Sequence, residues 1–153
     1  FLEYLGEKMY EVLTDREYDG IVPVPLNRKR MEERGMNQAE LLAEHLSRKL
    51  GIPVLCALSR SGYQKPQSKT PIPEREKNIK GCFHACMDIR GKRILLIDDV
   101  RTTGSTAQAC ANELKNAGAT YVALCTIAVV YRNPKKMRFR QIHKKTKWTK
   151  HKK

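Results

Sequence analysis

The sequence contains no apolar stretch long enough to cross a membrane. Its longest largely apolar run, residues 121–131, has 11 residues, whereas a membrane-spanning helix needs about 20. We therefore expect a buried strand in this region and no membrane span. The first residue is Phe1 and not Met, so we expect the chain to be part of a longer protein.

Cysteine usage argues against a disulfide framework. The five cysteines are odd in number and no two of them have C-x-x-C spacing, which also argues against a zinc knuckle. We expect reduced thiols and a cytoplasmic location. Cys82, His84 and Cys86 alternate along an expected strand and therefore share one of its faces. We interpret them as part of a half-buried strand, with a metal site as the alternative.

Acidic residues are absent after Glu113, although the whole chain contains 16 of them. The rest of the chain holds 12 lysines and arginines, most of them within residues 132–153, so the pI of 9.8 belongs mainly to the C-terminal end. Residues 1–132 have a nearly balanced charge and enough apolar residues for one domain. We predict that residues 133–153 form a basic, disordered tail.

Helices and strands are expected to alternate along the chain. Apolar residues with helical spacing predict three helices, over residues 1–13, 37–51 and 104–116. Short β-runs are expected at residues 21–25, 53–58, 81–85, 93–97 and 121–130. The uninterrupted apolar strand at 93–97, followed by a helix and another strand, is typical of a βαβ unit. We therefore predict an α/β fold with a central, mainly parallel sheet flanked by helices.

The expected helix over residues 37–51 has signals at both ends. Asn37 is a good N-cap, and Glu40 stands three positions later, as in a capping box. Gly51 fits the position just after the last helical turn. We expect His45 to be exposed on this helix. Cys110, on the later helix, is expected to be buried.

Two adjacent carboxylates, Asp98 and Asp99, follow the buried strand, and a hydroxyl-rich turn follows them. Ligands of open α/β sheets bind at this carboxyl edge, and the amides that open the next helix favour an anion. Gly104 allows close approach of the backbone. Because carboxylates repel an anion, we expect a ligand with hydroxyls or a divalent cation besides its phosphate, as in a phosphorylated sugar.

The residues of this segment also allow other interpretations. A receiver domain has paired aspartates as well, but near its first strand and without a hydroxyl-rich turn. Asp98, Asp99 and the hydroxyl residues can form surface caps and an ordinary helix N-terminus. A Walker-type phosphate loop is excluded, because no Gly-Lys-Ser/Thr sequence follows the turn.

Residues 94–106 resemble the phosphoribosyl pyrophosphate (PRPP) motif of type I phosphoribosyltransferases. The similarity continues in residues 21–26, 34–43 and 74–83, and the second of these begins Arg-Gly-Met-Asn-Gln-Ala-Glu. Together the segments resemble the ComF family, which is associated with competence and DNA uptake. The resemblance covers residues 18–132 and implies a type I phosphoribosyltransferase-like fold.

The resemblance also implies which residues bind the sugar and its phosphate. Asp98 and Asp99 would bind the ribose 2′ and 3′ hydroxyls and form the catalytic pair. The 5′-phosphate would lie on the turn made by Thr102, Thr103, Gly104, Ser105 and Thr106.

Other segments would bind the pyrophosphate. The resemblance implies that it faces the turn made by Pro25, Leu26, Asn27 and Arg28. Mg²⁺ would be bound through PRPP and not by a direct protein site. Arg30 and Arg34 are further candidate counter-charges, with a solvated basic face as the alternative. Residues 59–78 would form a loop that closes over PRPP and brings to the leaving pyrophosphate two cations, Lys65 and Arg75.

Two function classes follow from these residues. As an enzyme, the chain would displace pyrophosphate from C1 of PRPP with an acceptor that the sequence does not identify, and catalysis would be electrostatic and positional. As a binding module, it would handle single-stranded DNA, because Phe139 and Trp148 lie among the basic residues of 133–153 and can stack on bases. A solvated terminus is the other interpretation of that segment. A transcription regulator on the same fold and a homodimeric assembly are further alternatives.

The chain departs from the family pattern at several points. Arg101 stands where the superfamily has an aliphatic residue, which makes the nearby field more positive. Family members often begin with a Cys-rich, zinc-ribbon-like module, which residues 1–153 do not include, and no hood subdomain for a nucleobase is visible in them. The acceptor therefore stays unidentified.

Overall fold

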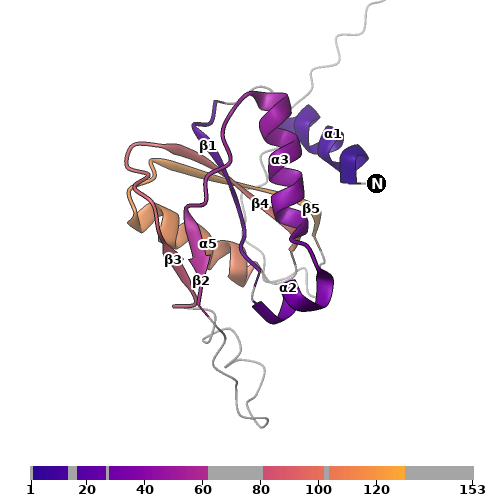
Figure 1. The fold of residues 1–153 in the computed structure, drawn as a ribbon. Coiled ribbons are helices and arrows are strands. Elements are labelled where there is room, and N and C mark those ends of the chain that lie inside the picture. Colours follow the sequence, from indigo (N-terminus) through magenta and orange to yellow (C-terminus); the bar gives the residue numbers. More distant parts are fainter. Residues whose placement is uncertain (1, 14–16, 27, 62–80, 102–103, 130–153) are drawn as a thin grey trace, which may run out of the picture.

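A computed structural model describes residues 2–13, 17–26, 28–61, 81–101 and 104–129 of the chain (Figure 1). Within these residues the elements follow in the order α1 (Leu2–Leu13), β1 (Gly20–Pro23), α2 (Arg28–Arg34), α3 (Gln38–Leu50), β2 (Leu58–Arg60), β3 (Phe83–Ala85), β4 (Arg93–Arg101), α5 (Ser105–Asn116) and β5 (Tyr121–Val129). The three helices expected from the sequence are confirmed as α1, α3 and α5.

The strand β4 is the centre of a three-stranded parallel sheet with the order β1-β4-β5. Ile21 lies opposite Leu95 on one side of β4, and Leu124 lies opposite Leu96 on the other. The helix α5 connects β4 to β5, so the predicted βαβ unit is confirmed. Because the three strands are parallel, their carboxyl ends point to the same edge of the sheet.

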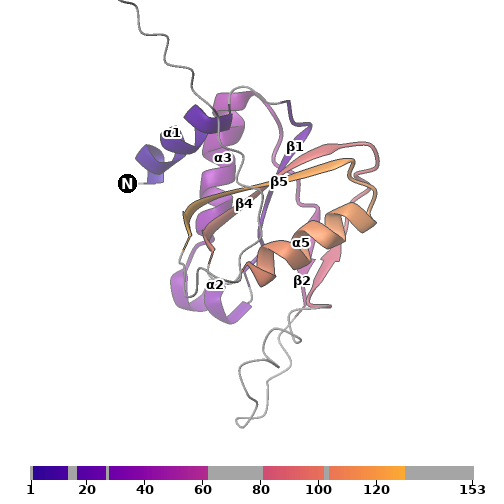
Figure 2. The ribbon, with the colours of Figure 1, turned by 180° about the vertical axis from the view of Figure 1, so that it is seen from behind.

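Helices cover both faces of this sheet, as the two views show (Figures 1 and 2). On one face, Ile94 and Leu96 belong to a core shared with α5 and with the β2–β3 ribbon. On the other face, Leu95 and Ile97 belong to a core shared with α1 and α3. All four side chains have no exposed surface, as expected for a strand that is buried on both faces.

The strand expected at residues 53–58 forms only in part. Val54 makes a single parallel bridge with Ile21 at the outer edge of β1. The strand β2 begins only at Leu58 and pairs antiparallel with β3 in a separate two-stranded ribbon. Pro53 has no N–H to donate to a ladder, and here it contributes only its carbonyl, which accepts from the N–H of Ile21 at 2.9 Å. The chain then leaves the sheet to form the ribbon.

The ends of α3 follow the expected signals. Asn37 is the N-cap, and its Oδ1 accepts the N–H of Ala39 at 3.1 Å. Glu40 accepts from the Nδ2 of Asn37 at 3.0 Å, whereas a capping box would place this carboxylate on the backbone N–H of the N-cap. Gly51 ends the helix with φ at 69°, the left-handed conformation that favours glycine.

The expectation that His45 is exposed is wrong. Its side chain is only 13% exposed because α1 packs across α3 at this point, and its Nε2 lies 3.2 Å from the Oε1 of Glu7. Gly6 makes the close packing of the two helices possible, since a methyl group at this position would collide with the His45 ring. The sequence pattern of α3 gave no sign of this neighbour.

All five cysteines are free thiols. In the part of the chain that the structure describes, no three His, Cys, Asp or Glu side chains are placed so that they could hold a metal ion. Cys82, His84 and Cys86 therefore do not form such a group. None of the helices within the described ranges has the length and apolar character needed to span a bilayer.

Candidate functional site

Asp98 and Asp99 lie near the carboxyl end of the central strand β4, where the sequence predicts the ligand site. Both carboxylates are half-buried. Strand alternation directs Asp98 to the face covered by α5 and Asp99 to the face covered by α3. Hydrogen bonds within the strand hold the pair, because the Oδ1 of Asp98 accepts the N–H of Asp99 at 3.0 Å and the Oδ1 of Asp99 accepts the N–H of Val100 at 2.7 Å.

The N-terminus of α5 lies close to these carboxylates along the chain. Only residues 102–104 separate the end of β4 from the start of the helix. Gly104 is the N-cap, with φ at 81° and no side-chain capping bond, and its carbonyl accepts the N–H of Gln108 at 2.9 Å. The N–H groups of a first helical turn have no partner within their own helix. This end of α5 is therefore suited to an anion.

Some of the predicted phosphate-binding residues can be placed. Gly104, Ser105 and Thr106 form the cap and first turn of α5, and each is half-buried. Thr102 and Thr103 lie outside the described residues, as does the side chain of Arg101. The described part of the predicted turn thus begins five residues after Asp99 in the chain.

The predicted pyrophosphate turn begins at the carboxyl end of β1. The N–H of Val24 donates to the carbonyl of Ile97 at 2.8 Å. This bond holds the end of β1 beside Ile97, the residue directly before Asp98. Pro25 and Leu26 follow and are half-buried. Asn27 lies outside the described residues, and α2 starts immediately after it, at Arg28.

The basic segment that contains three candidate arginines forms a helix that the sequence did not predict. The seven-residue α2 contains Arg28, Arg30 and Arg34, but apolar periodicity is absent from it. The side chains of Arg28 and Arg30 lie outside the described residues. The Nη1 of Arg34 lies 3.3 Å from the Oδ2 of Asp99 and 3.3 Å from the Oε1 of Gln38.

Asn37 has a positioning role that the sequence did not reveal. Besides capping α3, it donates from Nδ2 to the carbonyl of Val24 at 3.2 Å. Its side chain is buried, with 3% of the residue exposed. The sequence shows a cap residue directly after the Arg-Gly-Met run. This signal identifies Asn37 as a helix cap but does not indicate its bond to Val24.

Ser61 and Cys82, which flank residues 62–80, lie next to each other. The N–H of Ser61 donates to the carbonyl of Cys82 at 2.9 Å, which continues the pairing of β2 with β3. Residues 62–80, including Lys65 and Arg75, lie outside the described residues. The last residue of β2, Arg60, places its guanidinium carbon 5.0 Å from the centre of the Phe83 ring. No feature of the sequence marked Arg60.

Cys110 shows that the α5 side of the site is closely packed. The pKa of its thiol is raised to about 12, mainly by burial and also by the charge of Asp98, while Arg60 opposes the increase. Burial also raises the pKa of the Cys125 thiol, to about 11. Both cysteines are therefore neutral near pH 7 and unsuited to act as nucleophiles, and the expected burial of Cys110 is confirmed.

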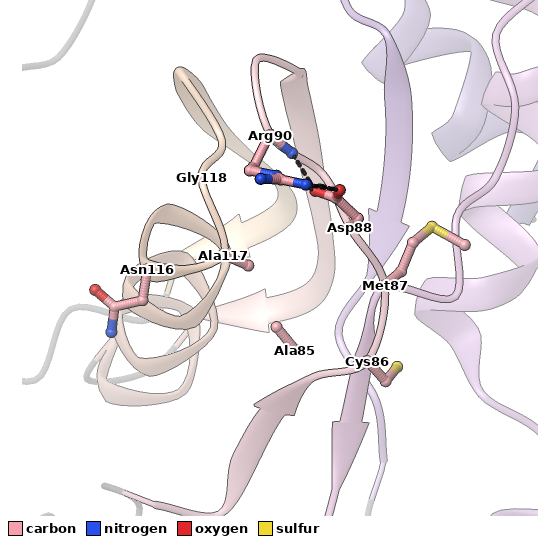
Figure 3. Close-up of a pocket in the computed structure, with 8 residues that line it drawn as sticks. All are labelled: Ala85, Cys86, Met87, Asp88, Arg90, Asn116, Ala117 and Gly118. Carbon is pink, nitrogen blue, oxygen red and sulfur yellow. Dashed lines mark hydrogen bonds and ion pairs between the residues drawn. The ribbon is translucent and has the colours of Figure 1, made fainter.

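A separate pocket of about 500 Å³ lies at the other end of α5 (Figure 3). Its wall is formed by Ala85, Cys86, Met87, Asp88, Arg90, Asn116, Ala117 and Gly118. An ion pair of 2.8 Å between Asp88 and Arg90 borders it. Since Asn116 is the last residue of α5 and Ser105 the first, the length of this helix separates the pocket from the acidic pair. The pocket contains none of the predicted site residues.

The fold and the site together define a phosphoribosyltransferase domain. The sequence pattern of the family described as "Phosphoribosyl transferase domain" matches residues 36–151, and the chain belongs to this family. Among solved structures, the chain is similar to glutamine PRPP amidotransferase from B. subtilis, with a TM-score of 0.58 and 23% identity over 82% of this chain and 26% of that one. It is also similar to a purine phosphoribosyltransferase from Pyrococcus horikoshii, with a TM-score of 0.56 and 23% identity over 83% and 71%. These likenesses confirm the predicted fold.

Within that class the chain is similar to competence and DNA utilization proteins. It is 34% identical over 114 residues to Competence protein F of Haemophilus influenzae, which covers 72% of this chain and 50% of the relative. It is 36% identical over 105 residues to DNA utilization protein YhgH of Escherichia coli K12, covering 68% and 46%. It is 37% identical over 100 residues to Competence protein ComFC of Bacillus subtilis, covering 64% and 39%. The chain thus spans half or less of the length of these relatives.

Proposed function

We propose that the chain binds PRPP with Mg²⁺ and transfers its phosphoribosyl group to an acceptor, within a role in DNA uptake like that of the ComF family. The observation that carries the proposal is the position of Asp98 and Asp99 near the end of the central strand, which only residues 102–104 separate from the start of α5. This arrangement offers acceptors for hydroxyls and donors for a phosphate within one edge of the sheet.

The carboxylates would bind the ribose and the helix end its phosphate. Each carboxylate oxygen has two lone pairs, so the strand hydrogen bonds of Asp98 and Asp99 leave acceptor capacity for the 2′ and 3′ hydroxyls. The amides of the α5 N-terminus and the hydroxyls of Ser105 and Thr106 would hold the 5′-phosphate. The turn after β1, which begins at Pro25, would face the pyrophosphate.

The residues at this edge fit a magnesium ion that binds mainly through its substrate. Mg²⁺ prefers oxygen ligands and keeps several waters, so it is usually held by one or two carboxylates together with phosphates. Asp98 and Asp99 can supply carboxylate oxygens, and within the described ranges no larger cluster of metal ligands competes with them. When bound with PRPP, Mg²⁺ would neutralise part of the charge of the pyrophosphate.

The chemistry of the site would be positional and electrostatic. The C1–O bond to pyrophosphate breaks and a bond from C1 to the acceptor forms, while positive charge develops on the ribose and negative charge on the leaving group. Half-buried carboxylates beside the ribose would stabilise the first charge. Cys110 and Cys125 supply no nucleophile, because burial keeps both thiols protonated near pH 7.

Calorimetric titration with PRPP, in the presence and absence of Mg²⁺, tests the proposal. We expect binding that requires Mg²⁺ and weakens by about tenfold or more in Asp98→Asn and in Asp99→Asn. Asp88→Asn is the matched control, since it removes an exposed carboxylate at the far end of α5 and should bind as the wild type does. Absence of Mg²⁺-dependent binding to the wild type, or equal effects of all three variants, would contradict the proposal. Release of pyrophosphate in the presence of candidate acceptors then tests transfer.

Handling of single-stranded DNA is the second candidate function. It is supported by the names of the relatives, which include competence and DNA utilization proteins, and by the basic sequence of residues 133–153. We expect binding of an oligonucleotide to weaken steeply as salt increases and to fall when residues 133–153 are deleted. Salt-independent binding, or binding unchanged by the deletion, would count against this function.

A further inference from the structure

Arg34 makes a contact that its proposed role as a pyrophosphate ligand does not require. Its Nη1 lies 3.3 Å from the Oδ2 of Asp99 and at the same distance from the Oε1 of Gln38. The two partners come from different parts of the fold, since Asp99 is on the central strand and Gln38 is the first residue of α3. The guanidinium therefore joins the α2–α3 corner to the second carboxylate of the site.

The backbone around Arg34 holds the guanidinium in this place. Arg34 is the last residue of α2, and Gly35 reverses the chain with φ at 70° while its N–H donates to the carbonyl of Met31 at 2.8 Å. This left-handed residue brings Gln38 beside Arg34. The next anchor is Asn37, whose buried amide binds the carbonyl of Val24. The corner is thus attached to the end of β1 on one side and to Asp99 on the other.

The contact with Arg34 and a hydrogen bond within the strand together hold both oxygens of Asp99. Its Oδ1 accepts from the strand N–H of Val100 at 2.7 Å, and its Oδ2 accepts from Arg34. A carboxylate held at both oxygens has one preferred orientation, and each oxygen keeps a lone pair for a ribose hydroxyl. Arg34 is 46% exposed and Asp99 is 23% exposed, so the ion pair adds little to folding stability. Its effect is to orient the carboxylate.

We propose that Arg34 is a positioning residue for Asp99, which aligns this carboxylate for the ribose and does not bind the pyrophosphate. The inference rests on the proposed function, because it assigns Asp99 to the sugar. It predicts that Arg34 matters for every ligand that carries the ribose and for none that lacks it. A pyrophosphate ligand would show the opposite pattern.

Three ligands separate the two roles: PRPP with Mg²⁺, ribose 5-phosphate, and inorganic pyrophosphate with Mg²⁺. We expect Arg34→Ala to weaken PRPP and ribose 5-phosphate by the same factor, on the order of tenfold, and to leave pyrophosphate unchanged. Arg34→Lys should restore part of the loss, because an ammonium can still pair with the carboxylate but lacks the planar fork. Loss of PRPP and pyrophosphate binding with ribose 5-phosphate unchanged would overturn the inference. Arg48→Ala is the charge-matched control, since Arg48 is exposed in the last turn of α3, at the other end of that helix.

A double-mutant cycle gives a second test. If Arg34 acts through Asp99, the variant Arg34→Ala/Asp99→Asn should bind PRPP no more weakly than Asp99→Asn alone. Additive losses would mean that Arg34 contacts the ligand independently, and would overturn the inference.

The same cycle in urea unfolding keeps the inference separate from the proposed function. It needs no ligand, and a direct pair should change the unfolding constant by about twofold to fivefold beyond additivity. If the wild type binds neither PRPP nor ribose 5-phosphate, the proposed function fails, whereas the unfolding cycle still measures the contact. Strict additivity in unfolding would contradict the contact itself.

Discussion

The side-chain amide of Asn37 donates to the carbonyl of Val24 at 3.2 Å, and this bond ties the start of α3 to the end of β1. Asn37 is 3% exposed, so water cannot readily replace either partner. The same side chain caps α3 through its Oδ1, which accepts the N–H of Ala39. One residue therefore fixes both the start of α3 and Val24, which directly precedes the predicted pyrophosphate turn.

Substitutions at Asn37 should separate these two bonds. Asn37→Asp keeps the capping oxygen but loses the donor to Val24, whereas Asn37→Ala loses both. We expect Asn37→Ala to lower the free energy of unfolding by about 2 kcal/mol, measured by urea denaturation. Asn37→Ser, which can cap but cannot reach as far, should retain more stability than alanine. A fully stable alanine variant would show that the buried bond is not needed.

The outcome at Asn37 illustrates what the sequence could predict. The caps of α3 and the buried strand β4 depend on local signals, namely a polar cap, a glycine and an apolar run, and these were sufficient. The acidic pair and the helix start are close in the chain, so their order along β4 and α5 also followed from the sequence. The partner of the Asn37 amide is Val24, which lies directly after β1 and 13 residues away, and no local pattern encodes it.

Other errors in the prediction have the same origin. The helix α2 has no apolar periodicity because its seven residues are mostly charged, and the described residues 31–34 on it are all exposed. The strand expected at 53–58 is interrupted because the chain leaves the central sheet there and forms β2, which pairs with β3. His45 is covered by α1, which a pattern internal to α3 cannot show. For the 53–58 strand and for His45, a tertiary contact overrides the local signal.

Replacement of Gly6 by alanine has two opposite effects on the free energy of unfolding, and the sign of the change shows which effect is larger. Alanine is favoured over glycine within a helix by about 1 kcal/mol, so Gly6→Ala would stabilise an isolated α1. In the folded protein the new methyl group would collide with the His45 ring, and we expect a net loss of about 1–3 kcal/mol. Thermal or urea unfolding measures this. The double variant Gly6→Ala/His45→Ala should recover stability relative to Gly6→Ala, and failure to recover it would show that the strain lies elsewhere.

The cysteines should differ sharply in reactivity. At pH 8, a thiol whose pKa is about 12, as for Cys110, is ionised in only about one molecule in ten thousand. Cys56 and Cys86 are exposed. We expect rapid labelling of these two thiols by a thiol reagent and labelling of Cys110 only on unfolding, followed by peptide mass spectrometry. Labelling of Cys110 at the rate of Cys86 would contradict its burial.

The same raised pKa predicts a dependence of stability on pH. Below the unfolded value near 9 the Cys110 thiol is neutral in both states and contributes no pH dependence. Between about 9 and 12 the unfolded state loses the proton first, so the free energy of unfolding falls as pH rises. Comparison of the wild type with Cys110→Ala over this range isolates the effect, and the alanine variant should show the shallower decline. Parallel curves would mean that the thiol has an ordinary pKa in the folded protein.

Thr126 provides a test of how rigidly the acidic pair must be held. Its hydroxyl donates to the backbone carbonyl of Asp99 at 3.1 Å, and therefore links β5 to the strand position that carries the second carboxylate. Thr126→Val has nearly the same shape and a good strand propensity, so it removes little besides the bond. We expect a loss of up to about 1 kcal/mol in the free energy of unfolding and a several-fold weaker affinity for PRPP. Thr126→Ser retains the hydroxyl and should bind PRPP almost as the wild type does. If Thr126→Val binds PRPP as tightly as the wild type does, the hydrogen bond to Asp99 is not needed to hold the acidic pair.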